Sequence, residues 1–217
     1  MPFRLSIFAP DWFAVMLPAG DDGVVDDAVI RLARPRHGHF DLGTGYHGDV
    51  WLDLDALFLR PAALRPHVRM LAGRIGEHHP DAVCGPMEGG AFLAQAIADA
   101  LGTAFLPAAR APAPQRAATA GYLLPRVPGG ISGWRVAIAD DAVNAGTAVA
   151  ACSSLLRGRG AVPIAVAALI SLGPASAAVA QASVPFYAAG SMESRAWPAG
   201  QCPHCADGLP LTGSPEE

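Results

Sequence analysis

Predicted strands and helices alternate through most of this chain, and that alternation limits the choice of fold more than any other feature. The strand-like apolar segments cover residues 82–85, 104–108, 135–139, 162–172 and 184–188. The helical patterns between them cover residues 91–101, 146–157 and 175–182. Strands and helices in alternation form a parallel sheet flanked by helices, so an α/β fold is predicted. Binding sites in such sheets gather at the carboxyl ends of the strands.

The region before this alternation shows a different pattern, with two short extended segments joined by a glycine-containing turn. The elements predicted there are a helix at 23–34, extended segments at 39–42 and 49–54, and a helix at 61–78. Pro80 ends the last of these helices. We expect an N-terminal hood at residues 1–60, an α/β core at 61–190 and a C-terminal tail at 191–217.

The charge of the chain argues against some classes of function. Its 217 residues carry a net charge of −4, and all 15 of its lysine-plus-arginine residues are arginines. An acidic chain is not expected to bind nucleic acid or an anionic membrane through bulk electrostatics. Because arginine stays protonated, a mechanism that needs a lysine amine is excluded.

The apolar segments do not predict a membrane protein or a secreted one. The longest, at residues 161–172, is too short to span a bilayer. Pro10 and Asp11 interrupt the apolar N-terminal run, and no small-residue cleavage site follows. We therefore expect a cytoplasmic protein whose four cysteines are reduced.

Two carboxylates end the predicted strand at 135–139, and a run of small residues follows them. Asp140 and Asp141 come first, and Asn-Ala-Gly-Thr-Ala at 144–148 opens the next helix. Turn N–H groups, a threonine hydroxyl and the positive end of a helix form a cradle for an anion. A phosphate held there would place an attached sugar beside carboxylates, which suit ribose hydroxyls, Mg²⁺-bound diphosphate or developing positive charge. The plainer alternative is that the aspartates merely end a strand and begin a helix.

The segment DDAVNAGTA at 140–148 resembles the motif with which type I phosphoribosyltransferases bind PRPP (5-phosphoribosyl 1-diphosphate), and is closest to the orotate phosphoribosyltransferase version. Three stretches agree with that family in the same order: residues 38–47 with its base-binding turn, 84–91 with its diphosphate loop, and 110–121 with its flexible catalytic loop. The resemblance covers about residues 20–190. It implies the type I phosphoribosyltransferase fold, a mostly parallel sheet flanked by helices with a small N-terminal hood.

By that resemblance, each part of PRPP and of the acceptor base has its own set of residues. Asp140 and Asp141 would contact the ribose hydroxyls. The 5-phosphate would be held by Asn144, Ala145, Gly146, Thr147 and Ala148. The diphosphate, with Mg²⁺, would lie against Glu88, Gly89 and Gly90. The residues implied at the base are Thr44, His47 and Trp51, and those implied in catalysis are Asp141, Arg110 and Arg116.

The implied reaction is displacement of diphosphate from C1 of the ribose by a ring nitrogen of a small aromatic base. The enzyme would contribute positioning, charge stabilisation and exclusion of water rather than covalent catalysis. The resemblance also implies a homodimer in which the flexible loop reaches a neighbouring site.

The chain departs from the family at positions that recognise orotate. Gly43 and Gly89 stand where lysines are expected, Asn144 replaces a threonine, and Pro174 replaces an arginine. Two functions therefore stay open. One is an orotate phosphoribosyltransferase-like enzyme, and the other is a non-catalytic module of the same fold that binds PRPP or a nucleotide.

The tail contains the motif Cys202-Pro-His-Cys205, which is half of a zinc site. Completion would need His204, a histidine such as His78 or His79, or a partner subunit. A redox pair is an alternative, although the motif is not predicted to start a helix. The plainest interpretation is a tail with two reduced thiols.

Overall fold

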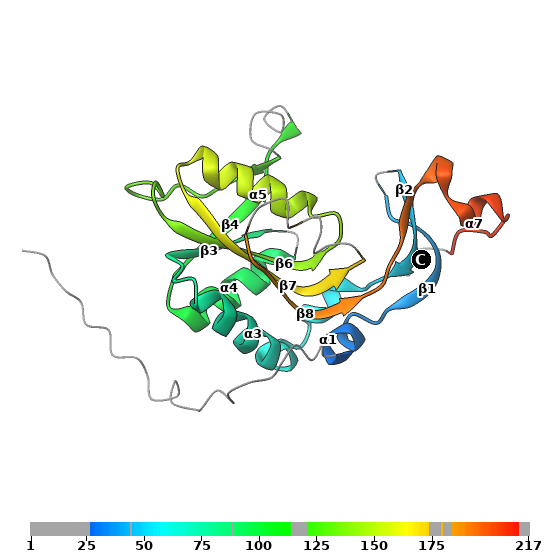
Figure 1. Ribbon diagram of the computed structural model, residues 1–217, viewed down its shortest axis with the longest axis horizontal. Helices are drawn as coiled ribbons and strands as arrows, with labels where there is room; N and C mark the ends of the chain where they lie inside the picture. The colour runs from blue at the N-terminus through cyan, green and yellow to red at the C-terminus, as the bar shows by residue number, and fades with distance from the viewer. Residues whose placement is uncertain are drawn as a thin grey trace, which may run out of the picture.

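The computed structural model describes residues 27–43, 45–87, 89–113, 121–173, 179 and 184–212. Within them the α/β fold is confirmed: a six-stranded sheet has the order β5-β4-β3-β6-β7-β8 (Figure 1). Neighbouring strands pair in parallel, except that β4 and β5 are antiparallel. The strands are β3 (Ala82–Pro86), β4 (Ala104–Arg110), β5 (Tyr122–Leu123), β6 (Arg135–Val143), β7 (Val162–Leu172) and β8 (Phe186–Met192).

Helices cover both faces of this sheet, as a parallel sheet requires. Helices α1 (Asp27–Leu32), α3 (Pro61–Gly76) and α4 (Gly90–Leu101) lie on one face, and α5 (Thr147–Gly158) lies on the other (Figure 1). Strand β7 shows how the sequence achieves this. Ala167 and Leu169 belong to the core under α3 and α4, whereas Val166 and Ala168 belong to the core under α5. Because side chains alternate along a strand, both faces must be apolar.

The predicted core elements differ from the observed ones mainly at their ends. Helix α3 ends at Gly76 rather than at residue 78, and β6 continues to Val143, so that the two aspartates lie inside the strand. The helix α2 (Leu54–Phe58) was missed. Its one sequence signal is the cap: the Asp53 side chain accepts a hydrogen bond of 3.1 Å from the N–H of Ala56.

A second sheet forms the hood, and it includes part of the tail. The hairpin of β1 (Arg36–Asp41) and β2 (Tyr46–Trp51) was predicted, and its turn places Gly43 and Gly45 at φ of 70° and 82°. Strand β9 (Ala196–Pro198) pairs antiparallel with β2. A 3₁₀ turn, η3 (Ala199–Gln201), and the short helix α7 (Pro203–Ala206) follow and lie beside the hairpin (Figure 1). The tail thus returns to the hood, a pairing that the sequence did not predict.

Several expectations fall on segments that the structure does not describe. These are the first part of the helix at 23–34, most of the loop at 110–121 and all but one residue of the helix at 175–182. Among the described residues, no helix has the length and apolar character needed to cross a bilayer.

Candidate active site

The candidate site lies where β6 ends, and its centre is a pair of buried carboxylates. Asp140 and Asp141 are 7% and 8% exposed. The Asp141 N–H donates to Oδ1 of Asp140 over 3.1 Å, and the Ala142 N–H donates to Oδ1 of Asp141 over 2.7 Å. Backbone donors therefore orient both carboxylates at the end of the sheet where sites of α/β proteins form.

Burial changes the acidity of this pair. Burial first, and the neighbouring Asp141 carboxylate second, together raise the pKa of Asp140 to about 8. Burial also raises the pKa of Asp141, although its hydrogen bond from Ala142 opposes the shift. Buried carboxylates close together favour retention of a proton. A bound cation, or hydroxyl groups that donate to the carboxylates, would favour release of that proton.

The backbone at the start of α4 packs directly against the two aspartates because Gly89 and Gly90 lack side chains. Gly89 has a φ of 140°, and a Cβ atom there would collide with the carboxylate of Asp141. A Cβ atom on Gly90 would lie 2.6 Å from Oδ1 of Asp140. Helix α4 begins at Gly90, so its positive end also faces the carboxylates. The side chain that the family carries at position 89 has no room in this arrangement.

The loop after β6 supplies the second part of the site. Gly146 adopts a left-handed conformation with φ of 69° and caps α5 without a side-chain hydrogen bond. The first N–H groups of a helix lack partners within the helix and are available to an anion. Ala145 and Thr147 are exposed beside Gly146, and Ala148 is half-buried in the first turn. The loop predicted to hold a phosphate therefore lies next to the aspartates and presents the start of α5.

A pocket of about 570 Å³ lies between the hood and the core. It is lined by residues that include Leu42, Trp51 and Asp55 of the hood side and Asn144 and Leu172 of the core. Asn144 belongs to the cradle, so the pocket is continuous with the phosphate loop. Trp51, predicted at the base, is among the residues that line it.

Three arginines that were not predicted as site residues also line this pocket: Arg34, Arg36 and Arg195. Arg34 lies 3.5 Å from the carboxylate of Asp53, with both side chains substantially exposed. Arg36 and Arg195 form no side-chain ion pair with any described residue. The only sequence pattern that pointed to Arg34 and Arg36 was their close spacing at the start of the hairpin. Arg195 could not have been found, because the path of the tail was unknown.

The other predicted site residues are distributed differently. The guanidinium of Arg110 lies over the ring of Tyr122, 5.5 Å from its centroid, at the end of β4. Three further predicted site residues lie outside the described residues: Thr44, Glu88 and Arg116. The same is true of Pro174, which stands where the family has an arginine.

His47 does not line the pocket; the structure places its ring against His39 and the two tail cysteines. The cysteines are grouped with histidines, as considered, but not with the histidines that were named. His78 instead forms a 2.8 Å hydrogen bond with the hydroxyl of Tyr187, and His204 is not among the four grouped residues. The expectation that the Cys-Pro-His-Cys motif does not start a helix was wrong, because Cys202 caps the start of α7. The short segment around it gave no helical periodicity to detect.

Comparison with known proteins agrees with this architecture. Residues 55–189 match the family model of the phosphoribosyl transferase domain. An orotate phosphoribosyltransferase from Heliobacterium modesticaldum is 30% identical over 175 residues, which cover 80% of this chain and 86% of that protein.

Solved structures share the fold. An orotate phosphoribosyltransferase from Aeropyrum pernix has a TM-score of 0.61 at 21% identity, covering 77% of this chain and 94% of that one. An adenine phosphoribosyltransferase from Thermoanaerobacter pseudethanolicus has a TM-score of 0.60 at 18% identity, and the match covers 76% of this chain and 99% of that one. With the family model, the curated relative and the sheet-end site in agreement, this chain belongs to the phosphoribosyltransferase family.

Proposed function

We propose that this phosphoribosyltransferase uses PRPP as donor and an acidic nitrogen base of the orotate class as acceptor. The observation that carries the proposal is the continuity of two sites. The carboxylate pair and phosphate cradle at the end of β6 adjoin, through Asn144, a pocket lined by Arg36 and Arg195. A phosphoribosyl group and an anionic base held in these two places would meet at C1 of the ribose.

The parts of PRPP are assigned from the local chemistry. Backbone N–H groups at residues 144–148 and the positive end of α5 hold the 5-phosphate. Asp140 and Asp141 accept hydrogen bonds from the ribose hydroxyls. The diphosphate would lie along the backbone at Gly89 and Gly90, where the absence of side chains also leaves room for the two carboxylates.

The family typically uses Mg²⁺ together with PRPP, and the residues present fit that ion. Mg²⁺ prefers oxygen ligands and commonly binds through one or two carboxylates plus substrate phosphates. Asp140 and Asp141 offer such oxygens beside the glycine turn. When bound, Mg²⁺ would neutralise charge on the departing diphosphate.

The reaction needs no covalent intermediate with the protein. The lone pair of a ring nitrogen forms the new bond to C1, the C1–O bond breaks, and its electron pair leaves with diphosphate. The proton of the attacking nitrogen passes to diphosphate or water. Positive charge that develops on the ribose is stabilised by the Asp140 and Asp141 carboxylates.

An acidic base is favoured by the cations at the pocket. The family positions now occupied by Gly43, Gly89 and Pro174 offer no charge. Arg36 and Arg195 supply positive charge from different elements, and a guanidinium binds a carboxylate in bidentate fashion. The curated relative, an orotate phosphoribosyltransferase, supports the same base class.

The proposal is tested by incubating the protein with PRPP, Mg²⁺ and separate bases, and measuring diphosphate and nucleotide together. We expect turnover with orotate to exceed turnover with uracil, which lacks the carboxylate, and with adenine. Faster turnover with adenine would contradict the acidic-base assignment. Binding of PRPP without turnover of any base would favour the alternative of a non-catalytic sensor, which the missing lysines motivate.

We further propose that the chain forms a homodimer, by analogy with the family. Light scattering on the purified protein should give twice the mass of 22.3 kDa for the chain. A monomer at micromolar concentration would contradict this.

A further inference from the structure

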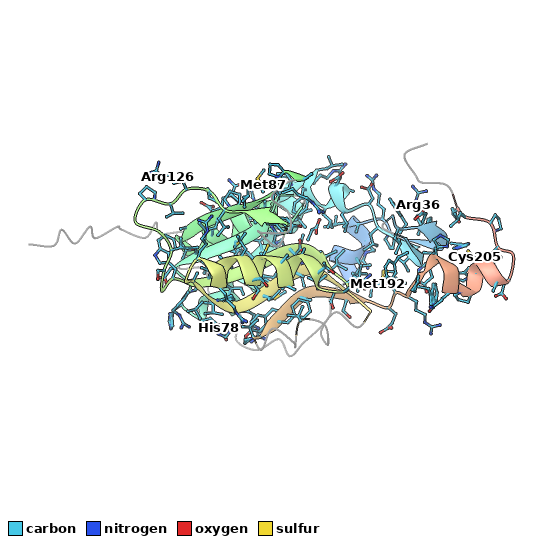
Figure 2. All side chains as sticks on the ribbon, turned by 90° about the horizontal axis from the view of Figure 1, so that it is seen from above. Arg36, His78, Met87, Arg126, Met192 and Cys205 are labelled. Atoms are coloured by element: carbon cyan, nitrogen blue, oxygen red, sulfur yellow. The ribbon has the colours of Figure 1, made fainter. Side chains whose placement is uncertain are left out.

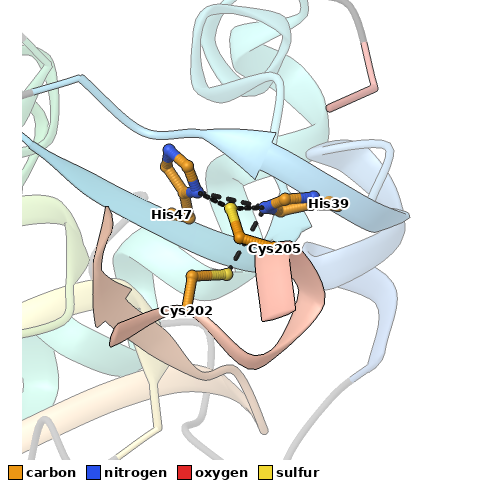
Figure 3. Close-up of side chains that lie close together, drawn as sticks. All are labelled: His39, His47, Cys202 and Cys205. Carbon is orange, nitrogen blue, oxygen red and sulfur yellow. Dashed lines mark hydrogen bonds between the residues drawn. The ribbon is translucent and has the colours of Figure 1, made fainter. Parts of the chain in front are cut away.

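Two histidines and two cysteines meet in the hood (Figure 3), and none of the four lines the pocket. His39 and His47 come from the β1–β2 hairpin, and Cys202 and Cys205 come from the tail at α7. One ligand atom from each residue lies within 4.8 Å of all the others.

The separations within this cluster match a tetrahedral centre. Nε2 of His39 lies 3.1 Å from Nδ1 of His47 and 3.4 Å from Sγ of Cys202. Sγ of Cys205 lies 3.6 Å from Nε2 of His39 and 3.3 Å from Nδ1 of His47. With Zn–N bonds of about 2.0 Å and Zn–S bonds of about 2.3 Å, tetrahedral ligands lie about 3.3–3.8 Å apart. The cluster therefore needs little adjustment to enclose a zinc ion.

The surroundings orient one ligand for metal binding. Nδ1 of His39 lies 2.9 Å from the carbonyl oxygen of Leu209, so it donates its N–H there. In the neutral ring, this leaves Nε2 with a lone pair directed into the cluster. Such a second hydrogen bond to a carbonyl is the usual support of a metal-binding histidine. His39 and Cys202 are also buried, at 4% and 3% exposure.

Apart from hydrogen bonds to the hairpin, the tail has little packing that could hold its shape. Between residues 199 and 212, Cys202 is the only buried residue. The elements there are η3 and the four-residue helix α7, which are too short to be stable alone. Small segments without an apolar core commonly depend on a metal or disulfide. An ion bound by all four side chains would fasten this segment to the hairpin.

We propose that His39, His47, Cys202 and Cys205 form a structural zinc site that joins the C-terminal tail to the hood hairpin. Two nitrogen and two sulfur ligands in a tetrahedron suit Zn²⁺. All four positions come from the protein, which is the pattern of a structural rather than a catalytic site. Binding of Zn²⁺ releases the protons of the two thiols. His47 serves as a ligand here and not as a contact of the base.

The primary test measures metal in the full-length, untagged protein after zinc loading and gel filtration. We expect about one zinc per chain in the wild type. Cys205→Ser should lower zinc affinity at least about tenfold, whereas His37→Asn should retain it. His37 is the matched control, because it is an exposed histidine on the same strand, β1.

A second measurement guards against a variant that fails to fold. Wild-type protein is stripped with a chelator and reloaded with Co²⁺, whose visible spectrum reports tetrahedral thiolate coordination. The C-terminal segment should exchange amide hydrogens faster in the stripped protein and recover on reloading.

Wild-type protein that holds less than about a quarter equivalent of zinc after loading would overturn the proposal. So would full zinc retention in Cys205→Ser. An intact mass lower by two hydrogens, with no zinc, would show a Cys202–Cys205 disulfide instead. None of these results depends on transferase activity, so they are independent of the proposed reaction.

Discussion

The carboxylate site of the core and the histidine–cysteine cluster of the hood are built in opposite ways. The core site is formed by neighbours in sequence at the end of a buried strand, so ordinary apolar packing holds it in place. The hood cluster joins residues 163 positions apart and has almost no apolar core beneath it. Figure 2 shows Cys205 and Arg36 at one end of the molecule and Arg126 toward the other. We infer that binding of PRPP and recognition of the base depend on different stabilising interactions.

The largest effect is expected from removing charge in the core. Asp141→Asn keeps the size of the side chain but removes a carboxylate that we propose contacts the ribose. We expect the rate of diphosphate release to fall by about 10²–10³, the loss typical of one electrostatic contact to a transition state. Zinc content should be unchanged, because the cluster lies elsewhere. A variant with near wild-type turnover would show that this site is not where transfer occurs.

The reverse experiment removes a ligand of the hood cluster. Cys205→Ser should release the tail and loosen the β1–β2 hairpin, which carries Arg36 and Trp51 at the pocket. We expect the KM for the base to rise about tenfold, a typical loss for a displaced charged contact, while the Kd for PRPP changes less than about twofold. Steady-state kinetics and calorimetry would measure the two quantities. An equal weakening of base binding and PRPP binding would mean that the hood and the core do not act independently.

Removing pocket charge tests base recognition alone. Arg195→Ala and Arg36→Ala should each raise the KM for orotate about five- to tenfold, because each removes a charge-assisted contact. The Kd for PRPP should not change. Arg126→Ala is the matched control, since Arg126 is exposed and distant from the pocket (Figure 2). Equal effects in all three variants would indicate only a general influence of charge.

The smallest effect is expected from pH. The pKa of Asp140 is raised to about 8, so this side chain is protonated below that pH and ionised above it. PRPP with Mg²⁺ requires the ionised form, so its binding should tighten as pH rises toward 8 and level off above it. Between pH 7.5 and 8.5 the gain should be about threefold. Calorimetry with Asp140→Asn as control would measure it. A pH-independent Kd in the wild type would rule out this titration.

How much was visible in the sequence differs between the two regions. The core site was predictable because Asp140, Asp141 and the phosphate loop are contiguous, and one strand-to-helix turn brings them together. The hood cluster was not, because it depends on β9 pairing with β2. A strand of three residues carries no periodicity that specifies its partner. The same pairing brings Arg195 to the pocket, so the place of this cation was also hidden in the sequence.

The most direct test of the account is one turnover assay on zinc-loaded protein with PRPP, Mg²⁺ and orotate. The account predicts equal molar amounts of diphosphate and of the nucleotide formed from the base. It also predicts that Asp141→Asn lowers the rate of formation of both products by about 10²–10³ without loss of zinc. Binding of PRPP with no diphosphate released, for orotate and for every other base tried, would contradict it.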